Sequence, residues 1–218
     1  MTETQIKILE AAEVEFADNG FNGASIRNIT QRAGVNIASI NYHFGSKESL
    51  FREMFHFRFD PINEIRLSRL REEQELRNGA PVPLELVIRI LVAPVFELLL
   101  SEADHPPPRF VLAIARCLSE PLELFTRLGG EVFQEVYETF FAAIRDALPQ
   151  ADVPQVRLQL NFAISSMVGM LTHFSRIEQF AGEPLFRRQK DEILQQFITF
   201  ITSGISGCVA AGPQHEER

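Results

Sequence analysis

The stretch from Asn36 to Lys47 carries side chains that could bind the surface of a DNA duplex. An Asn can pair with two hydrogen-bonding groups of an adenine edge, a Ser can bond to either class of base, and Ala or Ile can contact a thymine methyl group. A Tyr, His or Lys can reach the phosphates that hold a protein in register. The side chains expected to make these contacts are Ile37, Ala38, Ser39, Asn41, Tyr42, His43 and Lys47.

Apolar residues at helical spacing predict two short helices that would position these side chains. Gly34 lies between the two helices and can adopt the left-handed backbone that a tight turn requires. Two such helices predict a helix-turn-helix, whose second helix enters a DNA major groove. An ordinary helical hairpin with a solvated polar face is the alternative for the Ala-Gly-Val pattern alone. The repeating residues are Ile26, Ile29 and Ala33 in the first helix and Ile40 and Phe44 in the second.

Two polar residues stand where these helices should begin. Ser25 and Asn36 each precede an apolar run, so a side-chain oxygen of each could accept from the free N–H groups of the first turn. Ser25, Arg27 and Asn36 complete the set of residues that we expect to contact DNA.

The pattern continues well beyond the two helices. From Ile6 to Leu50 the chain reads I-K-I-L-E-A-A-E-V-E-F-A-D-N-G-F-N-G-A-S-I-R-N-I-T-Q-R-A-G-V-N-I-A-S-I-N-Y-H-F-G-S-K-E-S-L. This stretch resembles the DNA-binding domain of the TetR/AcrR family of bacterial transcriptional regulators, most specifically from Tyr42 onward. The resemblance implies a homodimeric repressor that a ligand releases from a palindromic operator. Asn41 stands where a Tyr is common and Ala24 replaces a frequent Thr, so we expect an altered base preference and one backbone contact fewer.

The net charge of −8 is unusual for a DNA-binding protein, but the charge is unevenly distributed. Residues 22–58 carry five basic and two acidic side chains, a net +3, whereas residues 1–21 carry −4 and the remainder −7. A basic region on an acidic body permits phosphate contacts while limiting indiscriminate binding. The positive charge of residues 22–58 therefore favours DNA binding more than the negative total charge disfavours it.

The overall composition, 45% hydrophobic and 23% charged over 218 residues, is typical of a globular protein. Cys117 and Cys208 lack the spacing of a metal site, so we expect reduced thiols. The N-terminus lacks the apolar core of a signal peptide, and charges interrupt the apolar run Leu84–Leu100. We therefore expect a cytoplasmic protein without a membrane segment, a metal or a cofactor.

Apolar periodicity predicts an all-α protein of about nine helices. We expect a three-helix helix-turn-helix domain in residues 1–47, a helical ligand-binding and dimerisation bundle in 48–211, and a flexible tail in 212–218. Gly20 should end the first helix, and Ser46 should cap the helix that links the two domains. Outside the helix-turn-helix, the predicted helices span about residues 4–19, 47–76, 84–101, 110–118, 121–148, 155–174 and 185–209.

Pro61 interrupts the predicted linking helix, so we expect a kink there. The resemblance implies that this helix is a lever between the ligand-binding and DNA-binding domains. Our hypothesis is that the bend sets the angle of that lever, and a kink that serves packing alone is the alternative. Arg66, Arg69 and Arg71 alternate with leucines in the same helix, and we expect them on a solvated face.

The chain contains 19 Phe and no Trp, which predicts a bundle core lined by aromatic and aliphatic groups. A pocket in such a core would suit a small apolar or aromatic effector oriented by a few polar groups. A core role for each Phe and a local partner for each polar residue are the alternatives. The residues expected to bind the effector are Phe96, Phe110, Arg116, Phe125, Asn161, Phe162, His173 and Phe174.

The last two predicted helices could form a four-helix interface with a second copy of the chain. Small residues between Ala163 and Met170 would allow close helix approach, and apolar residues recur along the final helix. Two copies would place two reading helices about one DNA turn apart, as a palindrome requires. The residues expected at this interface are Met167, Met170, Phe197, Phe200, Ile201 and Ile205.

Two other classes of function compete with a DNA-binding regulator. An enzyme is disfavoured because the sequence contains no G-x-S-x-G, no glycine-rich phosphate loop and no H-E-x-x-H. A scaffold that keeps the helix-turn-helix as a relic is disfavoured by the DNA-binding side chains it retains. Sequence does not determine the sign of regulation, so an activator or a ligand-independent regulator stays open.

Overall fold

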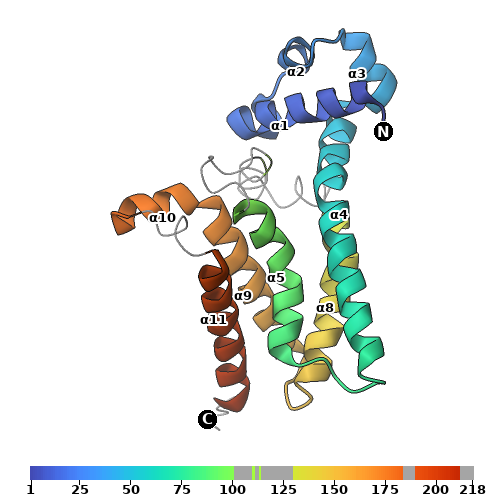
Figure 1. The fold of residues 1–218 in the computed structure, drawn as a ribbon. Helices are drawn as coiled ribbons and strands as arrows, with labels where there is room; N and C mark the ends of the chain where they lie inside the picture. The colour runs from blue at the N-terminus through green and yellow to red at the C-terminus, as the bar shows by residue number, and fades with distance from the viewer. Residues whose placement is uncertain (101–109, 111–112, 114–129, 184–189, 212–218) are drawn as a thin grey trace, which may run out of the picture. The chain divides into compact units, whose positions relative to one another are not determined.

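The computed structural model describes residues 1–100, 110, 113, 130–183 and 190–211. Every regular element within these residues is helical, which confirms the predicted all-α class (Figure 1). The elements are α1 (Glu3–Gly23), α2 (Ile26–Ala33), α3 (Ile37–Phe44), α4 (Lys47–Leu76), α5 (Leu84–Leu100), the 3-10 helix η1 (Gly130–Phe133), α8 (Gln134–Ala147), α9 (Val153–Thr172), α10 (Phe174–Ala181) and α11 (Lys190–Ala211).

The chain divides into two compact units, which are described separately. Unit 1 comprises residues 1–63 with the described part of 105–135, and unit 2 comprises 64–104 and 136–218 in their described parts. The division between Asn63 and Glu64 lies inside α4, later in the chain than the expected boundary at residue 47. The first turns of α4 belong to the core of unit 1, where Leu50, Phe51 and Met54 are among the buried residues.

A cluster of aromatic rings holds α1 against the start of α4 in unit 1. Gly20 breaks the regular helix of α1 with a φ of 69°, a conformation that favours glycine, and Phe21 turns back into the core. The Phe51 ring meets the rings of Phe16 and Phe21 edge to face, at centroid distances of 4.7 and 5.4 Å. The first helix is therefore broken at Gly20, where its end was predicted, although helical residues continue to Gly23.

The turn between α2 and α3 has the predicted geometry. Gly34 adopts the left-handed conformation at φ 67° and ψ 30°, and Asn36 caps α3 by accepting a hydrogen bond from the Ser39 N–H at 2.9 Å. Ser46 likewise accepts from the Ser49 N–H at 3.0 Å where α4 begins. Local capping thus fixes the start of α3 and the start of the helix that follows it.

α4 is assigned as one helix from Lys47 to Leu76, with Pro61 inside it. Pro61 lies two residues before Asn63, the last residue of α4 that belongs to unit 1. The buried Asn63 side chain donates to the Val132 carbonyl oxygen at 2.9 Å, and the Phe59 ring lies 4.8 Å from that of Phe133. Residues 132 and 133 therefore pack with the first half of α4, within unit 1.

In unit 2, α11 packs against both α5 and α9 (Figure 1). The Phe96 ring on α5 lies 5.1 Å from that of Phe197 on α11, and the Gln155 side chain on α9 donates to the Cys208 carbonyl oxygen at 3.1 Å. α9 begins at Val153, capped by Asp152, close to the predicted start. It ends at Thr172, and the separate short helix α10 that follows is not expected from the sequence.

The expectation that Arg66 lies on a solvated face is wrong, whereas Arg69 and Arg71 are exposed. Arg66 is only 3% exposed, and its Nε donates to the Leu91 carbonyl oxygen of α5 at 2.7 Å. Burial lowers the pKa of the Arg66 guanidinium to about 10. Pro94 lies within α5 and lacks the backbone N–H that would donate to the Ile90 carbonyl, whereas Arg66 binds the next carbonyl, that of Leu91.

Among the described residues, no helix combines the length and the apolar character needed to cross a membrane.

Candidate nucleic-acid interface and effector region

Helix α3 divides into a buried side and an exposed side. Ile40 and Phe44 are buried in unit 1, whereas Tyr42 is 85% exposed. A large aromatic side chain left this open on a short, capped helix is suited to contact another molecule. Of the other predicted contact residues, Asn36, Ile37, Ala38 and Asn41 are exposed, and Ser39 and His43 are half-buried.

Asn36 and Ser39 are hydrogen-bonded to each other. The Asn36 side-chain oxygen accepts from the Ser39 N–H at 2.9 Å and from the Ser39 hydroxyl at 3.1 Å. The two side chains therefore stabilise the start of α3 in the free protein. Asn41 and Tyr42 lie further along the helix, and the Tyr42 and His43 rings meet edge to face at 5.0 Å.

Ser25 does not cap α2 with its side chain, in contrast to the prediction. Its N–H donates instead to the Glu15 carboxylate at 3.0 Å, and the Asn28 amide donates to the same oxygen at 3.0 Å. Glu15 is 3% exposed, so a buried carboxylate accepts from the N–H of the residue before α2, and the expected hydroxyl cap on the first turn of α2 is not formed. Sequence reasoning missed Glu15 because its partners lie on a different helix and more than two helical turns away.

Several basic residues counted toward the local charge have partners inside unit 1. Arg52 pairs with Glu131 at 3.1 Å, and Arg58 pairs with the buried Glu13, its Nη2 lying 2.9 Å from Oε2. Lys47 donates to backbone carbonyls. By contrast, both arginines of α2, Arg27 and Arg32, are exposed. The basic character open to a duplex is thus greatest on α2, next to α3 in the chain.

Glu13 lies where α1 packs on α4, and both its burial and its partner Arg58 affect its protonation. Burial raises the pKa of the Glu13 carboxyl, and the pairing with Arg58 opposes that rise. The Arg58 guanidinium also lies over the Phe110 ring, 5.7 Å from its centroid. Arg58 therefore connects α1 to Phe110, which is buried in the same unit.

Both parts of the chain match models of one protein family. Residues 8–54 match the model described as bacterial regulatory proteins of the tetR family. Residues 89–204 match the model of a tetracyclin repressor-like C-terminal domain. The chain belongs to the TetR family. It is a transcriptional regulator of that family, as the resemblance of residues 6–50 implied.

Relatives of this TetR-family regulator include an uncharacterized HTH-type transcriptional regulator, YdgC, from Bacillus subtilis. The two are 31% identical over an alignment of 141 residues, and the match covers 58% of this chain and 68% of that protein. The HTH-type transcriptional dual regulator CecR from Shigella flexneri is 37% identical over 86 residues, 39% of this chain and 38% of its own.

Among solved structures, the regulator FadR from Bacillus subtilis in complex with stearoyl-CoA has the same fold. Its TM-score is 0.66 at 15% identity, over 89% of this chain and 97% of that one. FadR from Bacillus halodurans, described as a fatty acid degradation regulator, gives a TM-score of 0.64 at 16% identity, over 88% and 97% of the two chains.

The residues predicted to bind an effector fall in both units of this TetR-family chain, and some of them lie outside the described residues. Phe96 is buried against α11 in unit 2, and Phe110 is buried in unit 1. Phe162, Asn161 and His173 are exposed. Arg116 and Phe125 lie outside the described residues, and of Phe174 only the backbone position, at the start of α10, is described.

Asn161 and His173 both make contacts close to their own place in the chain. The Asn161 amide donates to the Arg157 carbonyl oxygen at 2.8 Å and to the Tyr137 hydroxyl at 3.0 Å. His173 Nδ1 lies 3.0 Å from the Gly169 carbonyl oxygen where α9 ends. These contacts fit the alternative given for each polar residue, a local partner.

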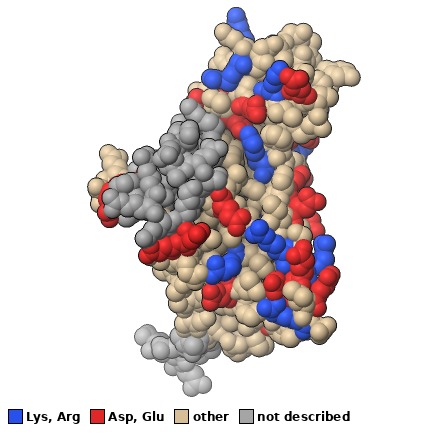
Figure 2. Space-filling model, in the orientation of Figure 1, with Lys and Arg blue, Asp and Glu red and all other residues tan. Residues whose placement is uncertain are grey.

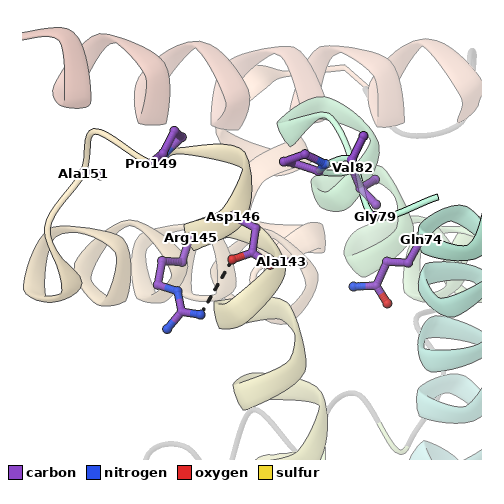
Figure 3. A pocket seen from close by; sticks show the side chains of 10 residues that line it. Gln74, Gly79, Val82, Ala143, Arg145, Asp146, Pro149 and Ala151 are labelled. Atoms are coloured by element: carbon purple, nitrogen blue, oxygen red, sulfur yellow. Dashed lines mark ion pairs between the residues drawn. The ribbon is translucent and has the colours of Figure 1, made fainter. Parts of the chain in front are cut away.

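Unit 2 contains a hollow that sequence reasoning did not identify. It has a volume of about 670 Å³ and lies between the end of α4, the loop before α5, the end of α8 and the loop before α9 (Figure 3). Figure 3 shows Gln74 on one side and the ion pair of Arg145 with Asp146, at 3.7 Å, on the other. Its remaining lining residues are Gly79, Ala80, Pro81, Val82, Ala143, Pro149 and Ala151.

A second hollow of about 280 Å³ lies on α4, α5 and α11. Its lining includes several charged side chains, and basic and acidic groups stand next to one another on the visible face of the molecule (Figure 2). Arg69 pairs with Glu97 at 3.7 Å, and Arg89 pairs with Glu85 at 3.3 Å. None of the predicted effector residues lines either of these two hollows.

Four of the six residues predicted at a dimer interface are buried within unit 2. Phe200, by contrast, is 68% exposed, and Met170 is half-buried. The two predicted helices are present as α9 and α11, but most of the residues predicted at the interface face the interior of unit 2. On α11 this is the side on which α5 packs. The four buried residues are Met167, Phe197, Ile201 and Ile205.

Proposed function

We propose that this TetR-family regulator is a homodimeric repressor whose two α3 helices read the two halves of a palindromic operator. The observation that carries this proposal is the division of α3 into a buried side, with Ile40 and Phe44, and an exposed side, with Asn41 and Tyr42. Asn41 would pair with an adenine edge. Tyr42 would contact a phosphate and hold the helix in register.

Further predicted contact residues, on α2 and α3 or next to them, extend this contact surface. Ile37 and Ala38 would contact thymine methyl groups, because both are apolar and exposed where α3 begins. Ser25, Arg27 and His43 would contact the phosphates on either side. Arg27 would contribute the largest electrostatic attraction of these, because its guanidinium is always charged.

The outward sides of α9 and α11 support the homodimer. Leu158 and Phe162 on α9 are 52% and 55% exposed, and Phe200 on α11 is exposed as well. A Cβ atom added at Gly204 would meet no heavy atom within 4 Å, so this stretch of α11 is open to a neighbouring helix. Exposed apolar side chains beside such an open helix surface are suited to a two-fold interface between identical chains.

An apolar effector is the ligand class that we infer for the bundle. The support is the abundance of buried apolar side chains in α5, α8 and α9, together with the fold shared with a FadR protein solved in complex with stearoyl-CoA. Such a ligand would weaken operator binding only if it binds more tightly to the conformation that does not bind DNA. Mass spectrometry of ligand that co-purifies with the protein would identify the effector.

Selection from a library of random duplexes tests the DNA-binding proposal. The chain should enrich an inverted repeat whose half-sites lie about 10 bp apart. The reason is that the two α3 helices of a dimer would each enter one of two successive major grooves on one face of the duplex. Enrichment of no sequence, or of a single unrepeated site, would contradict the proposed dimeric reading. The Asn41→Ala variant provides the control, because it should lose preference at one base position only.

Activation is the second candidate for the sign of regulation. It is favoured by the relative from Shigella flexneri, which is described as a dual regulator. A reporter gene placed behind the enriched operator distinguishes the two. A repressor lowers reporter output when the protein is expressed, and an activator raises it.

A further inference from the structure

The turn between α1 and α2 is held from two sides by charged side chains of unit 1. The Lys47 ammonium donates to the Ala24 carbonyl oxygen at 2.7 Å and to that of Asn22 at 3.3 Å. Glu15 accepts from the Ser25 N–H and the Asn28 side chain, both at 3.0 Å. Lys47 therefore satisfies carbonyl groups where α1 ends, and Glu15 satisfies donors where α2 begins.

Both charged groups lie partly or wholly out of water. Glu15 is buried, and Lys47 is half-buried, with its ammonium 5.0 Å from the centroid of the Phe21 ring. Burial lowers the pKa of Lys47, and the charge of Glu15 acts in the opposite direction. A charge withdrawn from water is stabilised by the hydrogen bonds that it keeps, so these contacts are costly to break.

The segment between these two groups carries residues of the proposed DNA interface. Ser25 and Arg27 lie at the start of α2, directly after the carbonyls that Lys47 binds. A shift of this turn would move both residues relative to α3. The Lys47 ammonium is directed toward the protein backbone in the free chain, so a phosphate would have to compete with two carbonyl oxygens for it.

We propose that Lys47, together with Glu15, is a positioning residue that fixes the α1–α2 turn for DNA binding, and that Lys47 does not itself bind phosphate. The inference rests on the proposed DNA-binding function. It revises the expected role of Lys47 and assigns a role to Glu15, which carries a negative charge and would by itself repel a duplex.

The dependence of DNA binding on salt separates positioning from phosphate contact. Each phosphate contact that is lost lowers the slope of log Kobs against log[salt] by about 1. The probes are the duplex that the wild-type full-length chain enriches and an unrelated duplex of the same length. Lys47→Met should weaken binding to both roughly tenfold with an unchanged slope, whereas Arg27→Gln, the matched control on α2, should lower the slope by about 1.

Glu15→Gln provides a second variant, for which electrostatics and positioning predict opposite changes in DNA affinity. Removal of a negative charge near DNA would strengthen binding if charge alone mattered. Positioning predicts a loss of about threefold or more, because the Ser25 N–H and the Asn28 amide exchange a carboxylate for a weaker neutral acceptor.

Amide hydrogen exchange of the DNA-free variants adds a readout that does not depend on binding. Exchange at Ala24 and Ser25 should be faster in Lys47→Met than in the wild-type chain, because the turn loses the group that holds its carbonyls. Arg27→Gln should leave the exchange at both positions unchanged, since the exposed Arg27 side chain lies outside the turn.

Three outcomes would overturn the inference. The first is a lower salt slope in Lys47→Met, which would make Lys47 a phosphate ligand. The second is unchanged affinity in that variant, and the third is tighter binding by Glu15→Gln. Failure of the wild-type chain to enrich any duplex would instead contradict the proposed function, and the hydrogen-exchange comparison would still test the positioning of the turn.

Discussion

Unit 1 and unit 2 differ in where each leaves large apolar or aromatic side chains exposed. In unit 1 the rings of Phe16, Phe21 and Phe51 are buried together, and the large apolar or aromatic side chains left exposed on α3 are Ile37 and Tyr42, which we assign to DNA contact. In unit 2 the outward sides of α9 and α11 leave large apolar side chains such as Phe162 and Phe200 exposed. The difference indicates that unit 1 exposes such side chains on the proposed DNA-binding helix, whereas unit 2 presents an apolar surface suited to a second chain.

The largest expected effect comes from the core of unit 1. Phe51→Ala should destabilise the protein by about 3–5 kcal/mol, because it removes a buried ring that contacts Phe16 and Phe21. Phe200→Ala should change the free energy of unfolding of the monomer by less than about 0.5 kcal/mol, because that ring is exposed. Urea denaturation at low protein concentration measures both, and similar losses in the two variants would contradict the comparison.

The next largest effect should appear in the assembly of unit 2. Phe200→Asp should weaken dimerisation by about 2–4 kcal/mol, because it would bury a carboxylate in the proposed apolar interface. Leu76→Asp at the end of α4 is the matched control, since Leu76 is also exposed but lies on neither α9 nor α11. Sedimentation equilibrium distinguishes the 24.7 kDa chain from its dimer. Dimers of equal stability in both variants would place the interface elsewhere.

A smaller and more specific effect is expected on α3. Asn41→Ala should reduce discrimination at one base pair by about 1–3 kcal/mol, because a bidentate contact to a base edge is lost. Tyr42→Phe should weaken binding evenly across sequences, since a phosphate contact carries no base information. Binding selections with the two variants provide the measurement. The reverse pattern would show that the two side chains have exchanged roles.

The smallest effect concerns Glu13 and depends on pH. Its folded-state pKa is raised, so protonation of Glu13 favours the folded state, and its contribution to stability falls as pH rises from 4.5, the ordinary value, through the folded-state pKa. Glu13→Gln mimics the protonated form and should be slightly stabilising at neutral pH, by less than about 1 kcal/mol. The gain should shrink as pH falls toward the ordinary value. Thermal unfolding across this range measures it, and a destabilised variant at neutral pH would mean that the Arg58 pairing outweighs burial.

The parts of the fold that the sequence predicts correctly depend on local signals. Asn36, Gly34 and the spacing of Ile40 and Phe44 lie within a short stretch of chain, and together they determine the turn and the buried side of α3. The cap at the start of α4 and the break near the end of α1 are local in the same way. Capping and turn geometry can be predicted from such short stretches because both partners lie in the same segment.

The features that the sequence does not reveal depend on partners distant in the chain. Lys47 and Arg66 stand in charged helical segments and resemble solvated residues, yet each donates to a backbone carbonyl of another helix or turn far along the chain. Phe200 and Ile201 are adjacent and both apolar, and the helices that pack on α11, α5 and α9, decide which of them is buried. Pro94 does not predict the Arg66 contact, because the carbonyl that it leaves without a backbone donor is that of Ile90, and Arg66 binds that of Leu91.

A hydroxyl-radical footprint of the enriched duplex tests the dimeric reading of DNA by α3 most directly. We predict two protected regions about one helical turn apart, with two chains bound to each duplex, and loss of that protection when Asn41 and Tyr42 are both replaced by Ala. A single protected region with one chain bound, or protection that survives the double replacement, would contradict this reading.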